Sequence, residues 1–505
     1  MQFLIDIALT LIYCFGFLLL CAWAWRFWIM WRNQDYLNRT NAEYVMLEIR
    51  LPREILKSPF ATEMAITSLL QTGGVGNWYD RLFKGNLPPY ASLEIASIEG
   101  VIHFYVRVQQ KFRALVESNF YAQYPGIEIV EASDYTSLIR YRHATDDKVG
   151  LWGAGFTLGE KWFFPMRDEK TGEPVKVKGK DYKPVADFFP IKTYVDFGIT
   201  NLDDENQIDP LSSLIEIMGT MKKGEHMWFQ IVFQSDELYD GTKMPLMYVD
   251  ESTHEHVSLT QLHEKFKKQV RMGAVIKEGT VVRDEYGYEI KKVKKDSEGN
   301  EKEEVLKYQE PKIIPKKETE LTAEEKWMIE ESNKKFGKPR VVAAVRLLYL
   351  VDQTIAPFNA QNIQNILSYP KIYKGANSFA PTVRATPYDF DWQNTFGRRV
   401  PWRKEEMFES YVEREAFYPH IPPRDWLDKR EDLFFWTSTM KARKTWRMFY
   451  EAFFHPFTHP HAEDVSTYNL EEIATLWHLP GATTTTPSLP RIDSAKSVAP
   501  VNLPQ

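Results

Sequence analysis

One glycine-rich stretch, GAGFTLGEKW over Gly153 to Trp162, comes nearest to a phosphate-binding loop. A P-loop needs backbone N–H groups that cradle phosphates, followed directly by Lys and Ser/Thr for the γ-phosphate and magnesium. Here Glu160 separates the last glycine from Lys161, and Trp162 stands where the hydroxyl residue would be. The stretch GTMKKGEH fails too, so we predict no ATPase site in this chain.

The sequence also lacks the residue patterns of nucleophilic catalysis. There is no G-x-S-x-G elbow, and the two cysteines, Cys14 and Cys21, both lie inside an apolar stretch. Carboxylates are numerous but are spread among lysines, which is typical of solvated faces. We therefore predict a protein that is not an enzyme, with no catalytic residues and no cofactor.

A histidine-rich stretch, HPFTHPHAED, carries side chains of the types that ligate zinc. They are His455, His459, His461, Glu463 and Asp464. The interleaved prolines break the helix that would place two histidines on one face, so a structural loop is favoured and no metal site is predicted. An enzymatic function would require a metal here.

Aromatic residues on one predicted strand, VIHFYVRV, leave nucleic-acid binding open as the alternative function. RNA-recognition modules stack bases on aromatic side chains of two central strands. His103, Phe104 and Tyr105 stand there with Arg107, but the partner strand offers only Tyr44 and the basic consensus is missing. Core aromatics are therefore favoured over a base-stacking surface.

A basic and aromatic segment, Asp432 to Phe457, allows two interpretations. It is either an amphipathic helix on a membrane surface or a helix packed on a neighbouring domain with a basic outer face, and the packed helix is favoured. The residues of this basic patch are Lys441, Arg443, Lys444, Trp446 and Arg447.

The apolar stretch from Phe3 to Trp31 determines where these residues are expected to lie. It is long enough for a helix that crosses the roughly 30 Å core of a bilayer, and it ends in tryptophans and arginines that resemble an interfacial belt. We predict a single-pass anchor in the inner membrane, with the N-terminus outside and the bulk of the chain cytoplasmic. The anchor residues are Phe3, Leu19, Trp23, Trp25, Arg26, Trp28, Trp31 and Arg32.

The composition suits a large chain with extensive cores. The 505 residues are 44% hydrophobic and 14% aromatic, with a net charge of −6 and a pI near 6.1. This balance gives no general attraction to nucleic acid or anionic lipid.

After the anchor, the residue pattern predicts two copies of one α+β plan. Residues 43–132 show the order β-α-β-β-α-β, with a tight-turn signal at Glu99-Gly100, which indicates a ferredoxin-like domain. A connector with strands spans 133–190. A second ferredoxin-like domain is predicted over 191–386, beginning with a strand at Ile191 to Ile199 and interrupted by a charged insertion at 236–339.

The remaining residues predict a helical region and a tail. Residues 401–480 read as helical, ending in a short helix whose Asn469 and Glu472 form a capping box. Its apolar face is predicted to dock a partner through Leu470, Ile473, Leu476 and Trp477. Residues 481–505 have the composition of a flexible linker.

Three segments together resemble a family of membrane-anchored bacterial proteins, notably from candidate-phylum lineages with small genomes. They are EYVMLEIRLPRE, GNWYDRLFKGNLPPYASLEIASIEGVIHFYVRV and NLEEIATLWHLPGATTTTPSLPRIDSAKSVAPVNLP. The resemblance implies a link to conjugation or type IV secretion-like machinery. In similar longer chains the last segment leads into a P-loop ATPase of the FtsK–HerA type. This sequence lacks that motor, so no ATPase residue carries over.

The leading expectation is therefore a non-enzymatic, membrane-anchored scaffold that docks a separately encoded FtsK–HerA-type ATPase. The expected partners are the lipid bilayer, that ATPase and a second copy of the chain, and nucleic acid is not favoured. The alternative is a membrane-tethered nucleic-acid-binding module.

Overall fold

The computed structural model describes the larger part of the chain in two compact units. The first unit comprises Met1–Glu160, Pro190–Leu246 and Lys338–Gln505, and the second comprises Lys161–Phe189 and Met247–Gly337. The described residues are 15–18, 20–22, 24–25, 28–29, 31–32, 35–36, 43–53, 55, 57–71, 79–80, 83–84, 86–87, 89–141, 148–159, 176–177, 180–181, 188–199, 209–235, 248–249, 256–257, 259–276, 291–295, 301–305, 312–382, 399–416, 465–481 and 487–492.

The first unit is built on a ten-stranded sheet whose first half follows one β-α-β-β-α-β stretch of chain. Its strands lie in the order β4-β1-β3-β2 and pair antiparallel. They are β1 (Tyr44–Pro52), β2 (Ala91–Ile98), β3 (Val101–Gln109) and β4 (Glu128–Ala132), with helices α2 (Pro59–Thr67) and α4 (Arg113–Gln123) between them. Glu99 and Gly100 link β2 to β3 with φ values of 54° and 90°, as a tight hairpin turn of the I′ type requires.

The second half of the sheet has the same chain order and strand order. Its strands lie in the order β16-β5-β15-β8, again antiparallel. They are β5 (Val149–Leu158), β8 (Glu225–Ser235), β15 (Arg340–Asp352) and β16 (Phe379–Thr382), with helices α5 (Pro210–Gly219) and α8 (Gln361–Ser368) between them. Strands β2 and β8 pair antiparallel, with Glu94 opposite Gln230, so the two halves form one continuous sheet.

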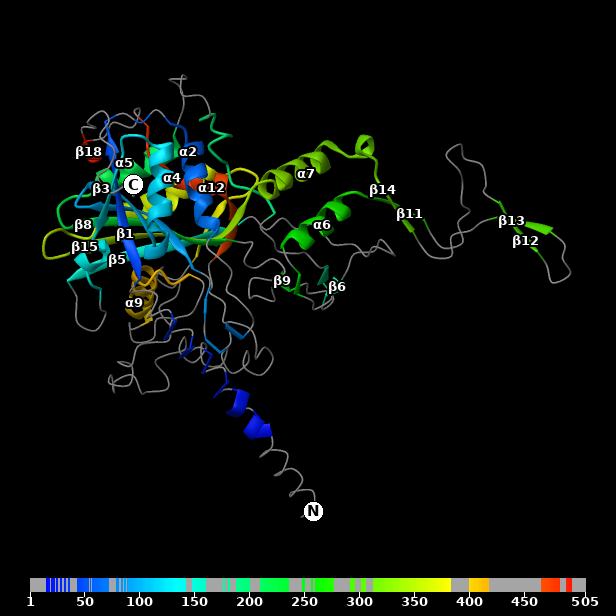
Figure 1. Cartoon of the computed structure of the whole chain (residues 1–505), viewed down its shortest axis with the longest axis horizontal. Helices are drawn as coiled ribbons and strands as arrows, with labels where there is room; N and C mark the ends of the chain where they lie inside the picture. The colour runs from blue at the N-terminus through cyan, green and yellow to red at the C-terminus, as the bar shows by residue number, and fades with distance from the viewer. Residues whose placement is uncertain are drawn as a thin grey trace, which may run out of the picture. The chain divides into compact units, whose positions relative to one another are not determined.

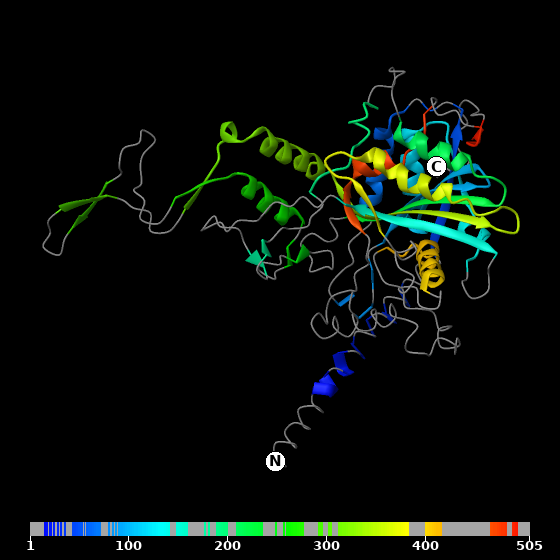
Figure 2. The same cartoon turned by 180° about the vertical axis from the view of Figure 1, so that it is seen from behind.

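The two faces of this sheet are covered differently. Helices α2, α4 and α5 lie on one face together with α12 (Leu470–Leu476), whereas α9 (Arg399–Val412) lies on the other (Figures 1 and 2). Alternating residues of each strand face the first helical layer and form the main core; Leu93, Phe104, Phe229 and Leu347 are each at most 1% exposed. A smaller aromatic core lies under α9 and includes Tyr105, Trp228 and Tyr411.

Short elements complete the first unit. Strand β17 (Ser466–Asn469) pairs antiparallel with β15, and β18 (Arg491–Ile492) pairs parallel with β1. The 3-10 helices are η1 (Ser68–Gln71), η2 (Gln110–Phe112), η3 (Tyr135–Leu138) and η6 (Tyr369–Tyr373).

The second unit has its own small core of aromatic side chains. Phe188 stacks on Phe266 at 4.9 Å, and the His263 ring stacks on Phe336 at 3.8 Å. Its elements are β6 (Lys176–Val177), β7 (Lys180–Asp181), β9 (Tyr248–Val249), β10 (His256–Val257), α6 (Leu259–Val270), β11 (Met272–Ile276), β12 (Lys291–Lys295), β13 (Glu301–Val305), β14 (Lys312–Pro315), η5 (Glu318–Glu320) and α7 (Ala323–Phe336).

The predicted transmembrane helix over Phe3 to Trp31 is corrected by the structure. Across the residues described here, no helix has both the length and the apolar character needed to cross a bilayer. Trp25 and Trp28 each contact Phe83, with ring centroids 6.0 and 5.6 Å away, and Arg32 Nε donates to the Phe83 carbonyl at 3.1 Å. These residues, predicted to form an interfacial belt, thus contact other residues of the protein. Hydropathy alone does not distinguish an aromatic residue that contacts lipid from one that contacts protein. Phe3, Leu19, Trp23 and Arg26 lie outside the described residues.

The predicted fold class, an anchor followed by two separate ferredoxin-like domains, is also wrong. The pairing of β2 with β8 merges both predicted domains into one antiparallel sheet. Edge strands that are apolar on one face and unpaired along their backbone favour such pairing, and the sequence of neither strand reveals its partner.

The strand predicted at Ile191 to Ile199 is a turn region instead, and β5 occupies the corresponding place in the sheet. The backbone N–H of Ile191 donates to Glu472 Oε1 at 2.9 Å, and that of Tyr194 donates to Thr475 Oγ1 at 2.9 Å. Helix α12 therefore binds two backbone N–H groups of this segment, and others bind carbonyls within the turns or on η6. The apolar residues of this segment are not all buried: Ile191 and Ile199 are, whereas Val195 is 47% exposed, so the alternation does not correspond to one buried face.

The predicted flexible tail, residues 481–505, is ordered over 487–492. Leu489 is 5% exposed, and Arg491 Nη1 donates to the carbonyls of Pro52 at 3.2 Å and Arg53 at 3.0 Å. Linker composition did not reveal this short strand, because its stability comes from contacts with β1.

Candidate functional site beneath helix α9

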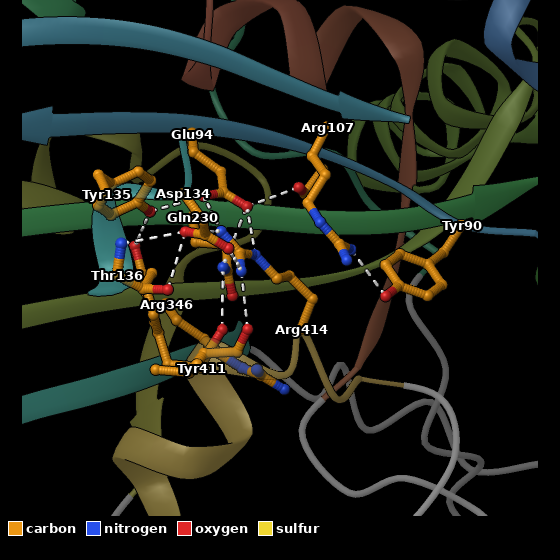
Figure 3. A network of polar contacts seen from close by, with 12 residues as sticks. Tyr90, Glu94, Arg107, Asp134, Tyr135, Thr136, Gln230, Arg346, Tyr411 and Arg414 are labelled. Atoms are coloured by element: carbon orange, nitrogen blue, oxygen red, sulfur yellow. Dashed lines mark hydrogen bonds and ion pairs between the residues drawn. The ribbon is translucent and has the colours of Figure 1, made fainter. Parts of the chain in front are cut away.

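A buried carboxylate, Glu94, lies at the centre of the sheet face that α9 covers. It stands on β2, where the alternation of the strand points Ser92, Glu94 and Ala96 away from the main core. Its side chain is fully buried. A buried charge requires partners that replace its lost hydration, and several segments of the chain provide them (Figure 3).

Arg414 is the main partner of Glu94 and lies two residues after the end of α9. Its Nε donates to Glu94 Oε1 at 3.1 Å and its Nη2 to Oε2 at 3.2 Å, a bidentate pair. The same guanidinium donates to both carboxylate oxygens of Asp134 and to the Val412 carbonyl. All five N–H donors of the arginine are thus engaged.

Neutral groups complete the shell around Glu94. Ser92 Oγ and the Tyr135 hydroxyl donate to it at 2.6 Å each, and Gln230 Nε2 donates at 3.2 Å. Gln230 belongs to β8, so this contact crosses the junction between the two halves of the sheet. Its amide also donates to the Tyr411 carbonyl on α9 at 3.2 Å.

The electrostatics favour a charged pair. Burial alone would raise the pKa of Glu94, but the charge of Arg414 and the surrounding hydrogen bonds outweigh it and lower that pKa. For Asp134 the same balance lowers the pKa of the carboxyl, with Arg414 and Thr136 opposing burial. Burial raises the pKa values of Tyr135 and Tyr411 well above the usual range, so both stay neutral donors.

Arg414 adopts a backbone conformation that ordinary residues avoid. Its φ is +54°, in the left-handed region, where a residue with a Cβ is less stable than glycine. Such conformations persist when surrounding contacts determine them. The ion pairs of the side chain supply those contacts and end α9 at the sheet.

A second arginine fixes the same end of α9. Arg346 of β15 donates from Nη1 to the Ser410 carbonyl at 2.8 Å and from Nη2 to the Glu415 carbonyl. Ser410 belongs to the last turn of α9, whose carbonyl groups have no partner within the helix, and Glu415 lies three residues beyond the helix. The site is therefore a clamp that joins α9, both halves of the sheet and the segment after β4.

The predicted docking residues of α12 are buried rather than available to a partner. Leu470, Ile473, Leu476 and Trp477 are each at most 1% exposed. The indole Nε1 of Trp477 donates to the backbone carbonyl of Glu94 at 3.2 Å. The predicted apolar face is real, but it packs on the sheet of its own chain because α12 covers the main core.

The aromatic strand behind the nucleic-acid alternative is divided between the two faces of the sheet. Phe104 lies in the main core, whereas Tyr105 is 5% exposed and stacks on Tyr135 at 5.1 Å. Arg107 stacks on Tyr44 at 4.4 Å. The rings of Tyr105 and Tyr44 therefore already stack on other side chains of the protein, on the sheet face where nucleic-acid bases would stack.

The remaining predicted site residues are a basic patch and a group of histidines. The basic patch Lys441, Arg443, Lys444, Trp446 and Arg447 and the histidines His455, His459 and His461 lie outside the described residues. Over the part of the chain that is described, no group of three or more His, Cys, Asp or Glu residues is placed to hold a metal ion.

Sequence reasoning missed the clamp. The available signal is Glu94 itself, the single charged residue of ASLEIASI, in a strand that is otherwise apolar or small. Comparisons with protein-family models, curated proteins and solved structures each returned no match.

Proposed function

We propose that the protein is a non-enzymatic scaffold or adaptor that binds a separately encoded ATPase of the FtsK–HerA type. The observation that carries the proposal is the use of the buried charges. Glu94 and Arg414 are both buried and pair with each other, and Arg414 also binds Asp134, whose side chain is 37% exposed. A catalytic carboxylate must reach its substrate, whereas these groups bind elements of their own fold.

The partner in this proposal comes from the sequence resemblance to chains that continue into such a motor. A rigid sheet with both halves joined suits a scaffold, because a pre-organised surface loses little entropy on binding. Because α12 is buried, the proposed contact with the ATPase must use another surface of the protein.

Helix α2 offers the apolar surface that we expect to make this contact. Phe60 and Met64 stand one helical turn apart and are 52% and 46% exposed. Helix α4 packs against α2 and exposes Leu115, which is 39% exposed. Contiguous exposed apolar patches mark protein interaction sites, and we expect these three side chains to form one.

Affinity purification of the full chain from cells that produce it tests the proposal. We expect a P-loop ATPase to co-purify and to bind the purified chain directly. The double variant Phe60→Ser, Met64→Ser should lose this binding, whereas Val101→Ser, at a residue 44% exposed on β3, should keep it. Absence of any P-loop ATPase from the purified complex would contradict the scaffold role, and binding unaffected by the double variant would exclude the α2 surface.

A further inference from the structure

A short segment of the first unit, residues 487–492, is bound to the sheet in the manner of a peptide ligand. Its strand β18, red in Figures 1 and 2, adds to β1 in parallel, with Arg491 opposite Leu51 and Ile492 opposite Pro52. Adding a strand to the edge of a sheet is a recurrent mode of peptide recognition, in which backbone bonds supply affinity and side-chain contacts supply specificity.

Ser488 binds two backbone groups of the sheet and the helical layer. The Ile102 N–H donates to the Ser488 carbonyl at 2.9 Å, and Ser488 Oγ donates to the Gly219 carbonyl at 3.2 Å. A Cβ on Gly219 would lie only 3.0 Å from the Ser488 Cβ. Glycine at the end of α5 therefore leaves the room that the serine occupies.

Leu489 is the apolar anchor of the segment. Its side chain is 5% exposed and packs in the main core, whereas Pro487 and Pro490 on either side are exposed. A proline ring fixes the backbone φ, so these residues lose little conformational freedom when the segment binds.

Arg491 supplies the polar specificity. Its guanidinium donates to the carbonyls of Pro52 and Arg53, and its Nη2 donates to the Gly481 carbonyl at 2.9 Å. Such fixed donors recognise a particular arrangement of acceptors, which a lysine does not reproduce. We call the surface that receives the segment the β18 site; it is formed by residues 51–53, Ile102 and Gly219.

The residues of the β18 site lie far from the segment in the sequence. Gly219 is 269 positions before Ser488, and Pro52 is 439 positions before Arg491. A second copy of the chain carries the same site and the same segment, so it could make these contacts equally well.

We propose that the β18 site is a peptide-binding site for a Ser-Leu-Pro-Arg segment, supplied by the same chain or by a second copy of it. A tethered segment has an effective concentration of about 1 mM, so the chain's own segment occupies the site first. When two copies exchange their segments, each fills the site of the other, and the result is a symmetric dimer.

Disulfide trapping in the full chain tests the exchange, with both native cysteines removed by Cys14→Ser and Cys21→Ser. The acceptor chain carries Pro52→Cys and also Leu489→Asp, which empties its own site. The donor chain carries Ile492→Cys. Mixing and oxidising the two should give a disulfide-linked dimer on a non-reducing gel. Adding Arg491→Ala to the donor should lower the dimer yield about tenfold, because hydrogen bonds of a charged group are lost.

A single chain that carries both Pro52→Cys and Ile492→Cys is the matched control. These positions are paired in the parallel register, so the control should form a disulfide within the chain. Failure of that disulfide would overturn the placement of the segment. Absence of the mixed dimer while the control cross-links would overturn the exchange, and so would a dimer yield that Arg491→Ala leaves unchanged.

A synthetic peptide gives the same decision if Leu489→Asp does not fold. The peptide spans residues 485–494 with Ile492→Cys, and the acceptor then carries Pro52→Cys alone. At a peptide concentration of about 5 mM, above the effective concentration of the tethered segment, we expect a disulfide between peptide and chain. The peptide with Arg491→Ala should react about tenfold less, and equal reaction of both peptides would overturn the proposal.

Discussion

Arg414 combines two features that are each costly alone: a buried charge and a left-handed backbone. The strain is of the order of 1–3 kcal/mol, and ion pairs with Glu94 and Asp134 offset it. Breaking a buried pair by removing one partner costs more than the pair itself contributes, since the other charge remains buried. The stability of the clamp therefore depends on both partners being present.

Glu94→Gln tests this dependence at a single residue. Removing the charge leaves the shape but deprives Arg414 of its bidentate partner, so we expect a loss of about 3 kcal/mol in the free energy of unfolding. Urea unfolding at neutral pH measures it. Glu128→Gln makes the same change in a carboxylate that is 49% exposed and pairs with Arg50 at 3.5 Å, and it should cost less than about 1 kcal/mol. Equal losses in the two variants would contradict a buried clamp.

Acid should weaken the same clamp. The pKa values of Glu94 and Asp134 are lowered in the folded protein, so their stabilisation is present above their unfolded pKa values, near 4, and lost as the pH falls through the lower folded values. We expect the urea midpoint to fall steeply below about pH 4. The fall should be shallower in Glu94→Gln, and identical slopes for variant and wild type would argue against this assignment.

Helix α12 shows what local sequence signals can predict. Asn469 Oδ1 accepts from the Glu472 N–H at 2.8 Å, and Glu472 Oε2 accepts from the Asn469 N–H at 2.7 Å, which is the predicted capping box. The two residues of the capping box lie within four positions of each other, so the sequence is sufficient to predict it. The surface on which α12 packs is formed by residues hundreds of positions away in the chain. The sequence around α12 does not show this surface, and the apolar face of the helix is therefore predicted to bind another protein.

Asn469→Ala should destabilise the protein by about 1 kcal/mol, because it removes the acceptor for an N–H at the start of α12. Thermal unfolding measures the effect. Asn469→Asp keeps an acceptor and should retain most of the stability. A variant with alanine that unfolds like the wild type would show that the cap does not stabilise α12.

The whole molecule shows where sequence reasoning stops. Alternation and turn signals predict β2, β3 and the turn at Glu99-Gly100, because each is encoded by adjacent residues. The pairing of β2 with β8 and the clamp of Glu94 with Arg414 are not predictable in this way, since the latter joins residues 320 positions apart. A pattern of apolar residues indicates that a strand is buried, but it does not identify the strand with which it pairs.

A continuous sheet predicts cooperative unfolding of its two halves. Leu93 on β2 and Leu347 on β15 are both fully buried, and each change to Ala should cost about 2–5 kcal/mol. Both variants should shift one common transition of the first unit, followed by circular dichroism during urea unfolding. Leu138→Ala, at a residue 56% exposed, should leave it in place. Two separate transitions, each sensitive to one variant, would show that the halves unfold independently.

The short strand β18 has a consequence for synthesis on the ribosome. It pairs with the end of β1, and Arg491 binds a carbonyl 439 positions earlier in the chain. Translation proceeds at about 5–20 residues per second, so the partner of Leu51 and Pro52 emerges at least tens of seconds after them. Throughout that interval this end of β1 lacks its native neighbour, so its backbone groups stay open to a chaperone.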